Sequence, residues 1–231
     1  MRDRDGDGDG DGDGDGDGAS IIWDLGGTLL DTYPDVDRAL ARAVFGDEPP
    51  GTAPRRIAEV ARLTRISSAR AIDELSARHG VPRHELQEAY DQVKERWREH
   101  PAPAMPGARE VMDAVREAGG ADLVATHRDA VSARMLLDAA GLEVEDLVCA
   151  PDAFTRKPDP QMLQALIARH RLDPAQVLAV GDRSADVEAA RAAGVPAVLL
   201  ETPGIHLPAG SAPRITRLAQ LLDVSPLTAR R

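Results

Sequence analysis

The chain has 231 residues, a single cysteine and a formal net charge of −11. One cysteine excludes an intramolecular disulfide framework, which fits a reducing cytoplasm. No apolar run reaches the roughly 18 to 20 residues that a membrane helix needs, and the first residues lack the apolar core of a secretory signal. The arginines are scattered and form no basic stripe for nucleic acid. We therefore expect a soluble, cytoplasmic protein that binds neither nucleic acid nor membrane. Its oligomeric state stays open.

The first 18 residues differ from the rest in composition. They alternate aspartate with glycine and hold eight aspartates against two arginines, so this tail supplies −6 of the net charge. Such a repeat cannot bury enough apolar surface to offset its ordering entropy. Asp3, Asp5 and Asp7 also match the first half of a calcium loop, but glycine stands at the twelfth position, where that loop needs a bidentate glutamate. We predict a disordered tail over residues 1–18.

After the tail, strand patterns alternate with helix patterns. Five short apolar runs bounded by turn residues predict buried strands at residues 20–24, 121–126, 146–150, 177–182 and 196–200. Apolar residues spaced three and four apart predict helices at residues 106–120, 128–142, 159–170 and 184–194. Residues 214–224 have the pattern of an amphipathic helix that closes the sheet. The alternation predicts an α/β fold with a doubly wound, Rossmann-like parallel sheet.

One interval breaks the alternation. Residues 33–100 contain no strand pattern, and helical patterns follow one another at residues 35–46, 53–63, 67–80 and 82–100. The sequence therefore predicts an all-helical cap inserted at residues 33–100 into a core made of residues 19–32 and 101–231. A module in this place lies over the strand ends, where it can act as a lid.

Polar side chains follow four of the predicted strands. In chain order the strand ends deliver Asp24, Thr126 with His127, Lys157 in the loop before the next helix, and Asp182 with Asp186. Because ligands of open parallel sheets bind at the carboxyl ends of the strands, we expect these groups to converge. The carboxylates suit a hard cation such as Mg²⁺. Asp24 could then attack a phosphorus atom, with Thr126 and Lys157 holding the phosphate oxygens.

Four motifs in this order resemble those of the haloacid dehalogenase superfamily. They are the segment "DLGGTLLD" from Asp24, then Thr126, then "KPDP" from Lys157, and "GDRSAD" with Asp182 and Asp186. The resemblance runs from residue 21 to about residue 200, and residues 33–100 correspond to the family's cap. Members with such a cap are mostly Mg²⁺-dependent phosphatases of small phosphorylated metabolites, phosphoglycolate phosphatase among them.

The resemblance also implies a role for each matching residue. It implies an aspartyl-phosphate intermediate on Asp24, with Thr126 and Lys157 completing the catalytic set. The implied metal ligands are Asp24, Asp182, Asp186 and the backbone carbonyl of Gly26. The implied substrate-binding residues are Gly27, Thr28, Thr126 and Lys157. Lys157 is one of only two lysines in an arginine-rich chain, and a compact ammonium suits a single phosphate oxygen beside a carboxylate.

Gly26 departs from the family pattern, which has a second aspartate at this position as the general acid and base. A positioned acid or base is typically worth roughly 10² to 10⁴ in rate. His127 is a candidate substitute, since histidine titrates near neutral pH. Loss of the acid also leaves open a substrate whose leaving group needs no proton, as in phosphonatase or dehalogenase chemistry. A third alternative is a weakly active or inactive module that binds a phosphorylated metabolite and serves regulation.

Overall fold

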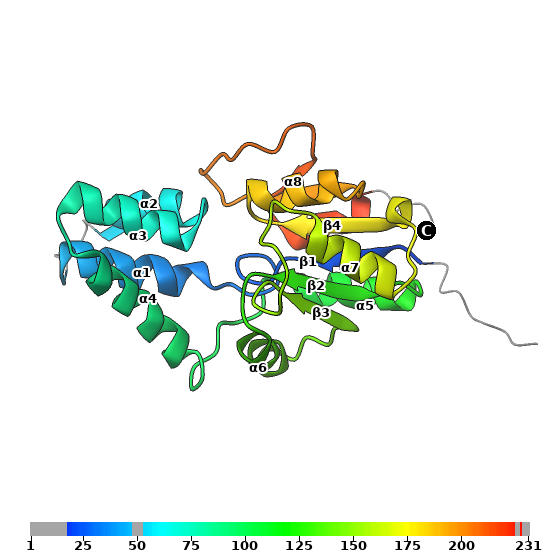
Figure 1. Cartoon of the computed structure of the whole chain (residues 1–231), viewed down its shortest axis with the longest axis horizontal. Coiled ribbons are helices and arrows are strands. Elements are labelled where there is room, and N and C mark those ends of the chain that lie inside the picture. The colour runs from blue at the N-terminus through cyan, green and yellow to red at the C-terminus, as the bar shows by residue number, and fades with distance from the viewer. Residues whose placement is uncertain (1–17, 48–52, 225–226, 228–231) are drawn as a thin grey trace, which may run out of the picture.

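The computed structural model describes residues 18–47, 53–224 and 227, so nearly all of the predicted Asp-Gly tail lies outside the described residues. These residues form two lobes, one built on a β-sheet and the other from four helices (Figure 1). None of the described helices is long and apolar enough to cross a membrane. The predicted α/β class is confirmed, because the sheet is parallel throughout and helices flank it.

The sheet has the strand order β3-β2-β1-β4-β5-β6. The strands are β1 (Ser20–Trp23), β2 (Asp122–Thr126), β3 (Asp146–Cys149), β4 (Val177–Gly181), β5 (Ala197–Leu200) and β6 (Arg214–Ile215). From β1 the chain adds β2 and then β3 on one side, and from β4 it adds β5 and then β6 on the other side. A crevice forms at such a switch point, outside the carboxyl ends of the two strands. The residues that follow β1 and β4 are therefore placed side by side.

The central strands are mostly apolar because helices cover both faces of the sheet. Alternate residues of β1 point to opposite faces, so Ile21 and Trp23 pack with helices α5 (Ala108–Glu117) and α6 (Ala130–Ala140). Ile22 packs on the other face with α7 (Gln161–Arg169) and α8 (Ser184–Ala192). This two-sided core fixes the register that carries the polar residues to the strand ends.

The helical lobe consists of α1 (Tyr33–Phe45), α2 (Ala53–Thr64), α3 (Ser68–His79) and α4 (Arg83–Arg96). Local signals set the bounds of α3, because the Ser67 hydroxyl accepts the Arg70 N–H at its start and Gly80 ends it with φ of 70°. Buried residues such as Leu40 and Leu75 join the helices. The lobe lies at the carboxyl ends of the strands (Figure 1). The division into a core and a cap at residues 33 and 100 stays a prediction.

Two segments connect the lobes, and they are paired with each other. Leu30 and Ala104 form an antiparallel bridge, the Asp31 N–H donates to Pro103 O at 2.9 Å, and the Met105 N–H donates to Leu29 O at 2.8 Å. The helical lobe is thus attached to the sheet lobe by a short two-stranded stem directly beside the end of β1.

The predicted helix over residues 214–224 is wrong. Arg214–Ile215 forms β6, paired with β5, and only Leu218–Asp223 is helical, as a 3-10 turn. Arg214 and Ile215 pair with β5 instead of starting a helix, because β5 would otherwise be an unpaired edge strand. Leu218 and Leu221 are both buried, and their spacing of three residues suits a 3-10 helix as well as the first turn of an α-helix.

Candidate active site

Three carboxylates meet at the switch point of the sheet. Asp24 directly follows β1, Asp182 directly follows β4, and Asp186 lies in the first turn of α8. All three are buried, and each offers an oxygen within 4.8 Å of the others'. The structure thus brings together the three acids that the sequence predicted as metal ligands.

Lys157 lies between two of these acids, Asp24 and Asp186, and is itself buried. Its ammonium lies 2.5 Å from Asp24 Oδ1 and 2.5 Å from Asp186 Oδ1, and it donates to the Ala125 carbonyl at 2.9 Å. Burial opposes the charged form, but the carboxylates of Asp186 and Asp24 outweigh it and raise the pKa of Lys157 above its ordinary value. Lys157 therefore remains a cation next to Asp24.

Asp182 accepts two hydrogen bonds from the segment that follows β1. Thr28 donates its hydroxyl to Oδ1 at 3.1 Å, and Tyr33 donates its hydroxyl to Oδ2 at 2.5 Å. Burial raises the pKa of Asp182 to about 7, although the Arg183 guanidinium opposes the shift. The resemblance implied a substrate-binding role for Thr28, whereas no sequence pattern pointed to Tyr33, two residues after the end of the first motif.

Gly27 is the residue that lets Tyr33 approach. Its φ of +93° is in the left-handed region, and a Cβ here would lie 2.3 Å from Tyr33 Cε2 and 2.8 Å from Asp182 Oδ2. No larger residue fits at this position. The glycine thus brings the start of the helical lobe into contact with a carboxylate of the sheet lobe.

Thr126 and His127 follow β2 on the same rim. Thr126 is buried, and its hydroxyl accepts the Arg128 N–H at 3.2 Å. His127 Nε2 accepts the backbone N–H of Lys157 at 2.9 Å. Burial and the charges of Lys157 and Arg183 lower the pKa of His127 to about 3. The imidazole is therefore neutral near pH 7, and its Nε2 is occupied in holding the loop that carries Lys157.

Arg183 is a second cation at the site, and it was not among the residues predicted from the sequence. Its Nη2 lies 3.5 Å from Asp24 Oδ1, and its Nε lies 3.9 Å from Asp186 Oδ2. Despite burial, these carboxylates raise its pKa above the ordinary value. Its position directly after Asp182 was the available signal. Two cations thus face three carboxylates, which leaves a net negative charge when all five groups are ionised.

Gly26 lines the cleft beside Asp24. A Cβ built on this glycine would meet Thr32 Oγ1 at 3.2 Å, a contact that a shift of a few tenths of an ångström relieves. The backbone at Gly26 therefore does not demand glycine, in contrast to Gly27. The second acid of the family pattern is missing from a position that could hold one.

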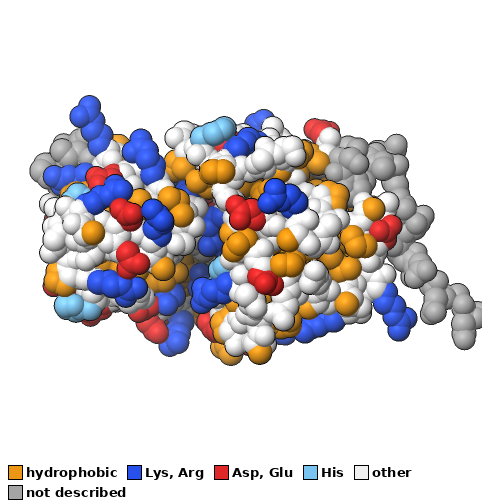
Figure 2. Space-filling model, turned by 45° about the horizontal axis from the view of Figure 1, so that its top comes forward, with side chains coloured by type: hydrophobic (Ala, Val, Ile, Leu, Met, Phe, Trp, Pro, Cys, Tyr) orange, Lys and Arg blue, Asp and Glu red, His pale blue; other side chains and the backbone are white. Residues whose placement is uncertain are grey.

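The cleft above these groups lies between the two lobes and has a volume of about 400 Å³. Figure 2 shows a hollow between the lobes with basic side chains on its walls. The basic residues that line the cleft are Lys94, Arg128, Arg156 and Arg183. The lining contains only two acidic residues, Asp24 and Asp129. The cleft therefore suits an anionic ligand.

The donor set fits a divalent cation. Asp24 Oδ2 is buried and, within the part of the chain that the structure describes, has no hydrogen-bond partner. A buried carboxylate oxygen without a partner is costly, so such an atom marks a place for a ligand or an ion. Together with Asp182 and Asp186, Asp24 supplies the oxygen donors that hard cations prefer. The cluster could therefore bind a divalent metal.

Comparisons with known proteins agree with this arrangement of an α/β fold and an acidic site at its switch point. The sequence model of the haloacid dehalogenase-like hydrolases matches residues 19–194. The chain therefore belongs to this family of hydrolases. It is 31% identical over 194 residues to a phosphoglycolate phosphatase of Rhodospirillum rubrum, covering 78% of each chain. It is 30% identical over 196 residues to an N-acetylmuramic acid 6-phosphate phosphatase of Pseudomonas aeruginosa, covering 81% of this chain and 83% of that one.

Solved structures show the same fold. A hydrolase from Pseudomonas syringae aligns with a TM-score of 0.66 at 25% identity, over 89% of this chain and 96% of that one. The protein CbbY from Rhodobacter sphaeroides, solved in complex with phosphate, aligns with a TM-score of 0.63 at 18% identity, over 88% and 96%. The alignments cover nearly the whole of both structures, so both lobes are shared.

Proposed function

We propose that this hydrolase is a Mg²⁺-dependent phosphatase of a small phosphorylated metabolite, similar to phosphoglycolate phosphatase. One observation carries the proposal: Asp24 Oδ2 is buried without a partner among the described residues, in a cluster of three carboxylates and two cations that faces a basic cleft. The relatives named as phosphatases support the same class of substrate.

In the proposed reaction, an oxygen of Asp24 attacks phosphorus. The new O–P bond forms as the bond to the leaving oxygen breaks, and this gives an aspartyl-phosphate. Water then attacks that phosphorus, so that phosphate leaves and Asp24 is restored. Lys157 and Thr126 bind the oxygens of the phosphoryl group. Gly27 and Thr28, which the resemblance also implied for substrate binding, support the site instead, because the Gly27 N–H donates to Leu30 O and the buried Thr28 hydroxyl donates to Asp182.

Asp24, Asp182, Asp186 and the backbone carbonyl of Gly26 would hold Mg²⁺. When bound, the ion offsets the negative charge that gathers when a phosphate meets three carboxylates. Lys157 is fixed by Asp24, Asp186 and Ala125 O, so its ammonium is positioned before a substrate arrives.

Gly26 limits the substrates that such a site can hydrolyse quickly. We do not assign the acid to His127, because its Nε2 accepts the Lys157 N–H and its pKa of about 3 leaves it neutral. The leaving oxygen must then depart as an anion or take a proton from water. Phosphate esters with a leaving group of low pKa suit this site. Alkyl phosphates, phosphoglycolate included, would react roughly 10² to 10⁴ times more slowly than in a site with the acid.

A binding function is the second candidate, and Gly26 is the observation that favours it. A site that keeps its metal and phosphate ligands but lacks the acid can hold a phosphorylated metabolite without turning it over. Phosphonatase chemistry is less favoured: Lys94, the only lysine in residues 33–100, lines the cleft, but its ammonium is paired with Asp91 at 2.5 Å.

A hydrolysis screen separates these functions. An activated aryl phosphate and a set of alkyl phosphometabolites are incubated with the wild type and with Asp24→Asn, with Mg²⁺ and with EDTA. The phosphatase proposal expects the aryl phosphate to be cleaved only by the wild type and only with Mg²⁺. Binding of phosphometabolites without any turnover would favour the binding module. Chloride release from a haloacid without Mg²⁺ would favour dehalogenation.

A further inference from the structure

A buried arginine of the helical lobe also bonds to the sheet lobe. Arg65 follows α2 directly and is only 6% exposed. Its Nη1 donates to both oxygens of Asp37, at 2.9 and 3.1 Å, and to the Thr64 hydroxyl at 2.8 Å. Its Nε donates to the Thr202 hydroxyl at 3.0 Å, and Thr202 lies after β5. One side chain thus spans both lobes.

The same guanidinium stacks on Tyr33. Arg65 Cζ lies 3.5 Å from the centre of the Tyr33 ring, within the range of a strong cation–π contact. Tyr33 in turn donates to Asp182 Oδ2, and its ring edge packs against Gly27. A continuous chain of contacts therefore runs from Thr202 through Arg65 and Tyr33 to Asp182.

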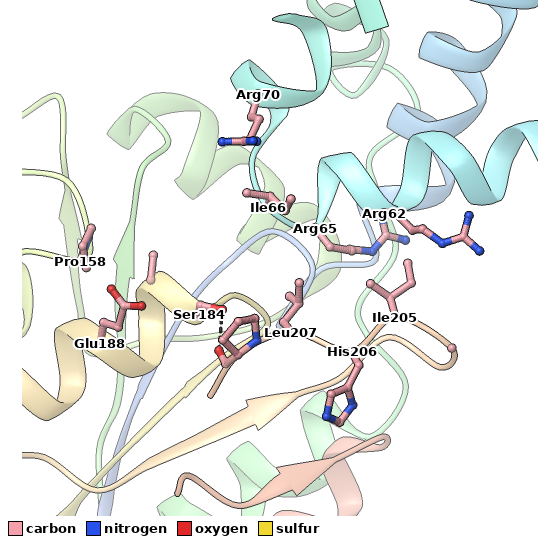
Figure 3. A pocket seen from close by; sticks show the side chains of 13 residues that line it. Arg62, Arg65, Ile66, Arg70, Pro158, Ser184, Glu188, Ile205, His206 and Leu207 are labelled. Carbon is pink, nitrogen blue, oxygen red and sulfur yellow. Dashed lines mark hydrogen bonds between the residues drawn. The ribbon is translucent and has the colours of Figure 1, made fainter. Parts of the chain in front are cut away.

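Arg65 lies at the boundary between the two lobes. Figure 3 shows Arg65 beside Arg62 on the helical-lobe wall of a second cleft, facing the segment with Ile205 and Leu207. This cleft has a volume of about 740 Å³. Any rotation of the helical lobe away from the sheet lobe would open this cleft and stretch the bond between Arg65 and Thr202.

A structural role inside the helical lobe accounts for only part of this geometry. Asp37 and Thr64 satisfy one end of the guanidinium within the lobe, and a buried ion pair of this kind is weak evidence for added stability. The bond to Thr202 and the stacking on Tyr33 are not required for that role. The first reaches the sheet lobe, and the second contacts the ring whose hydroxyl donates to Asp182.

We propose that Arg65 and Tyr33 are positioning residues that couple the docking of the helical lobe to the metal site. With the lobes docked, Arg65 holds the Tyr33 ring over Gly27, and the Tyr33 hydroxyl holds Asp182 Oδ2 in place. When the bond to Thr202 breaks, Tyr33 loses its support and Asp182 loses a donor. Coupling is reciprocal, so metal binding at Asp182 favours the docked lobe. This inference rests on the metal site of the proposed function.

The test measures Mg²⁺ affinity in the full chain. The dissociation constant is determined by titration calorimetry for the wild type, Tyr33→Phe, Thr202→Val and the double variant, and the unfolding midpoint is measured in EDTA. Loss of one hydrogen bond at this site should weaken Mg²⁺ binding about three- to tenfold in each single variant. Thr202 acts through Tyr33, so the double variant should bind Mg²⁺ no more weakly than Tyr33→Phe alone.

Two controls separate coupling from a general loss of structure. Thr202→Ser keeps the hydroxyl and should bind Mg²⁺ like the wild type. Arg62→Met removes an exposed arginine of α2 and should change neither the Mg²⁺ affinity nor the unfolding midpoint. Equal Mg²⁺ affinity in wild type and Thr202→Val, or additive losses in the double variant, would overturn the coupling.

The Mg²⁺ titration tests the coupling whether or not the protein hydrolyses a phosphate ester. If the wild type hydrolyses no phosphate ester while Thr202→Val still weakens Mg²⁺ binding, the proposed function is overturned and the coupling is supported. If the wild type is an active phosphatase and all variants bind Mg²⁺ equally, the reverse holds.

Discussion

Two buried groups of charges, one in each lobe, have opposite characters. In the helical lobe, Asp37 accepts hydrogen bonds at both oxygens, from Thr64 and Arg65, so the group is closed. At the switch point of the sheet, Asp24 Oδ2 is buried and lacks a partner among the described residues. Both oxygens of Asp37 are thus occupied, whereas the open group retains a carboxylate oxygen, Asp24 Oδ2, that can bind a ligand.

The pKa shifts of the carboxyls also differ between the two groups. In the helical lobe one carboxylate meets one guanidinium, and burial raises the pKa of Asp37 in spite of Arg65. At the switch point, burial raises the pKa of Asp182 to about 7, while Lys157 and Arg183 overcome burial and lower that of Asp186. Neighbouring carboxylates with pKa values displaced in opposite directions are typical of functional sites.

The largest expected effect is on activity at the open group. Asp24→Asn keeps the size of the side chain and removes the nucleophile, so hydrolysis of the aryl phosphate should fall by about 10⁴-fold or more. The unfolding midpoint should stay within a few degrees of the wild type, since the amide oxygen of asparagine can still accept from Lys157 and Asp186 still pairs with that ammonium. Steady-state kinetics and thermal unfolding check both expectations. A fall of less than tenfold would remove Asp24 from the reaction.

The closed group should respond in stability. Asp37→Ala leaves the buried Arg65 without its carboxylate, and breaking a buried pair costs about 3–5 kcal/mol. Urea unfolding of the wild type and the variant measures the difference. Arg38→Ala is a suitable control, because it breaks a surface pair with Asp35 of the same helix and should cost less than about 1 kcal/mol. Equal losses in the two variants would show that the closed group has no special structural role.

A third buried carboxylate sharpens the comparison. Asp122 is the first residue of β2 and so lies at the amino ends of the strands, opposite the active site. Its Oδ1 accepts the Trp23 Nε1–H at 2.7 Å, and its Oδ2 has no partner among the described residues. Burial raises its pKa to about 7, so the carboxyl is largely protonated below neutral pH. An oxygen without a partner is therefore not sufficient for a site, since an isolated carboxyl can take up a proton instead.

This shift predicts a pH effect on stability. The folded-state pKa of Asp122 lies above its unfolded value of 3.8, so its contribution is fully present below pH 4 and is lost as the pH rises through 7. Asp122→Asn carries no such charge and should lose less stability between pH 5 and pH 8, by about 2–3 kcal/mol. Urea unfolding at both pH values tests this. Parallel losses in the wild type and the variant would contradict the shift.

The smallest expected effect is a gain of activity. Gly26→Asp places a carboxyl beside Asp24 where only a modest shift of Thr32 is needed, so alkyl phosphate hydrolysis should rise by about 10²-fold. The aryl phosphate, which hardly needs protonation, should gain much less. Gly26→Asn has the same size without the titrating group and should give no gain on either substrate. An equal gain with asparagine would assign the effect to packing rather than to proton transfer.

The sequence determined the parts of this protein that depend on local pattern. Apolar runs placed β1 to β5, since strands covered on both faces are mostly apolar. The residues after these runs then gave Asp24, Lys157 and Asp182, because parallel strands deliver their carboxyl ends to one edge of a sheet.

The tertiary structure decided what depends on distant neighbours. The C-terminal segment became β6 because the edge of β5 was free to pair, which no local period reveals. Tyr33 and Arg183 reach the site through contacts with residues up to about 160 positions away. His127 changed from a candidate acid to a neutral acceptor because burial and nearby cations set its pKa. Burial, hydrogen bonding and long-range charge are properties of the folded chain, and together they distinguish the open group at Asp24 from the closed one at Asp37.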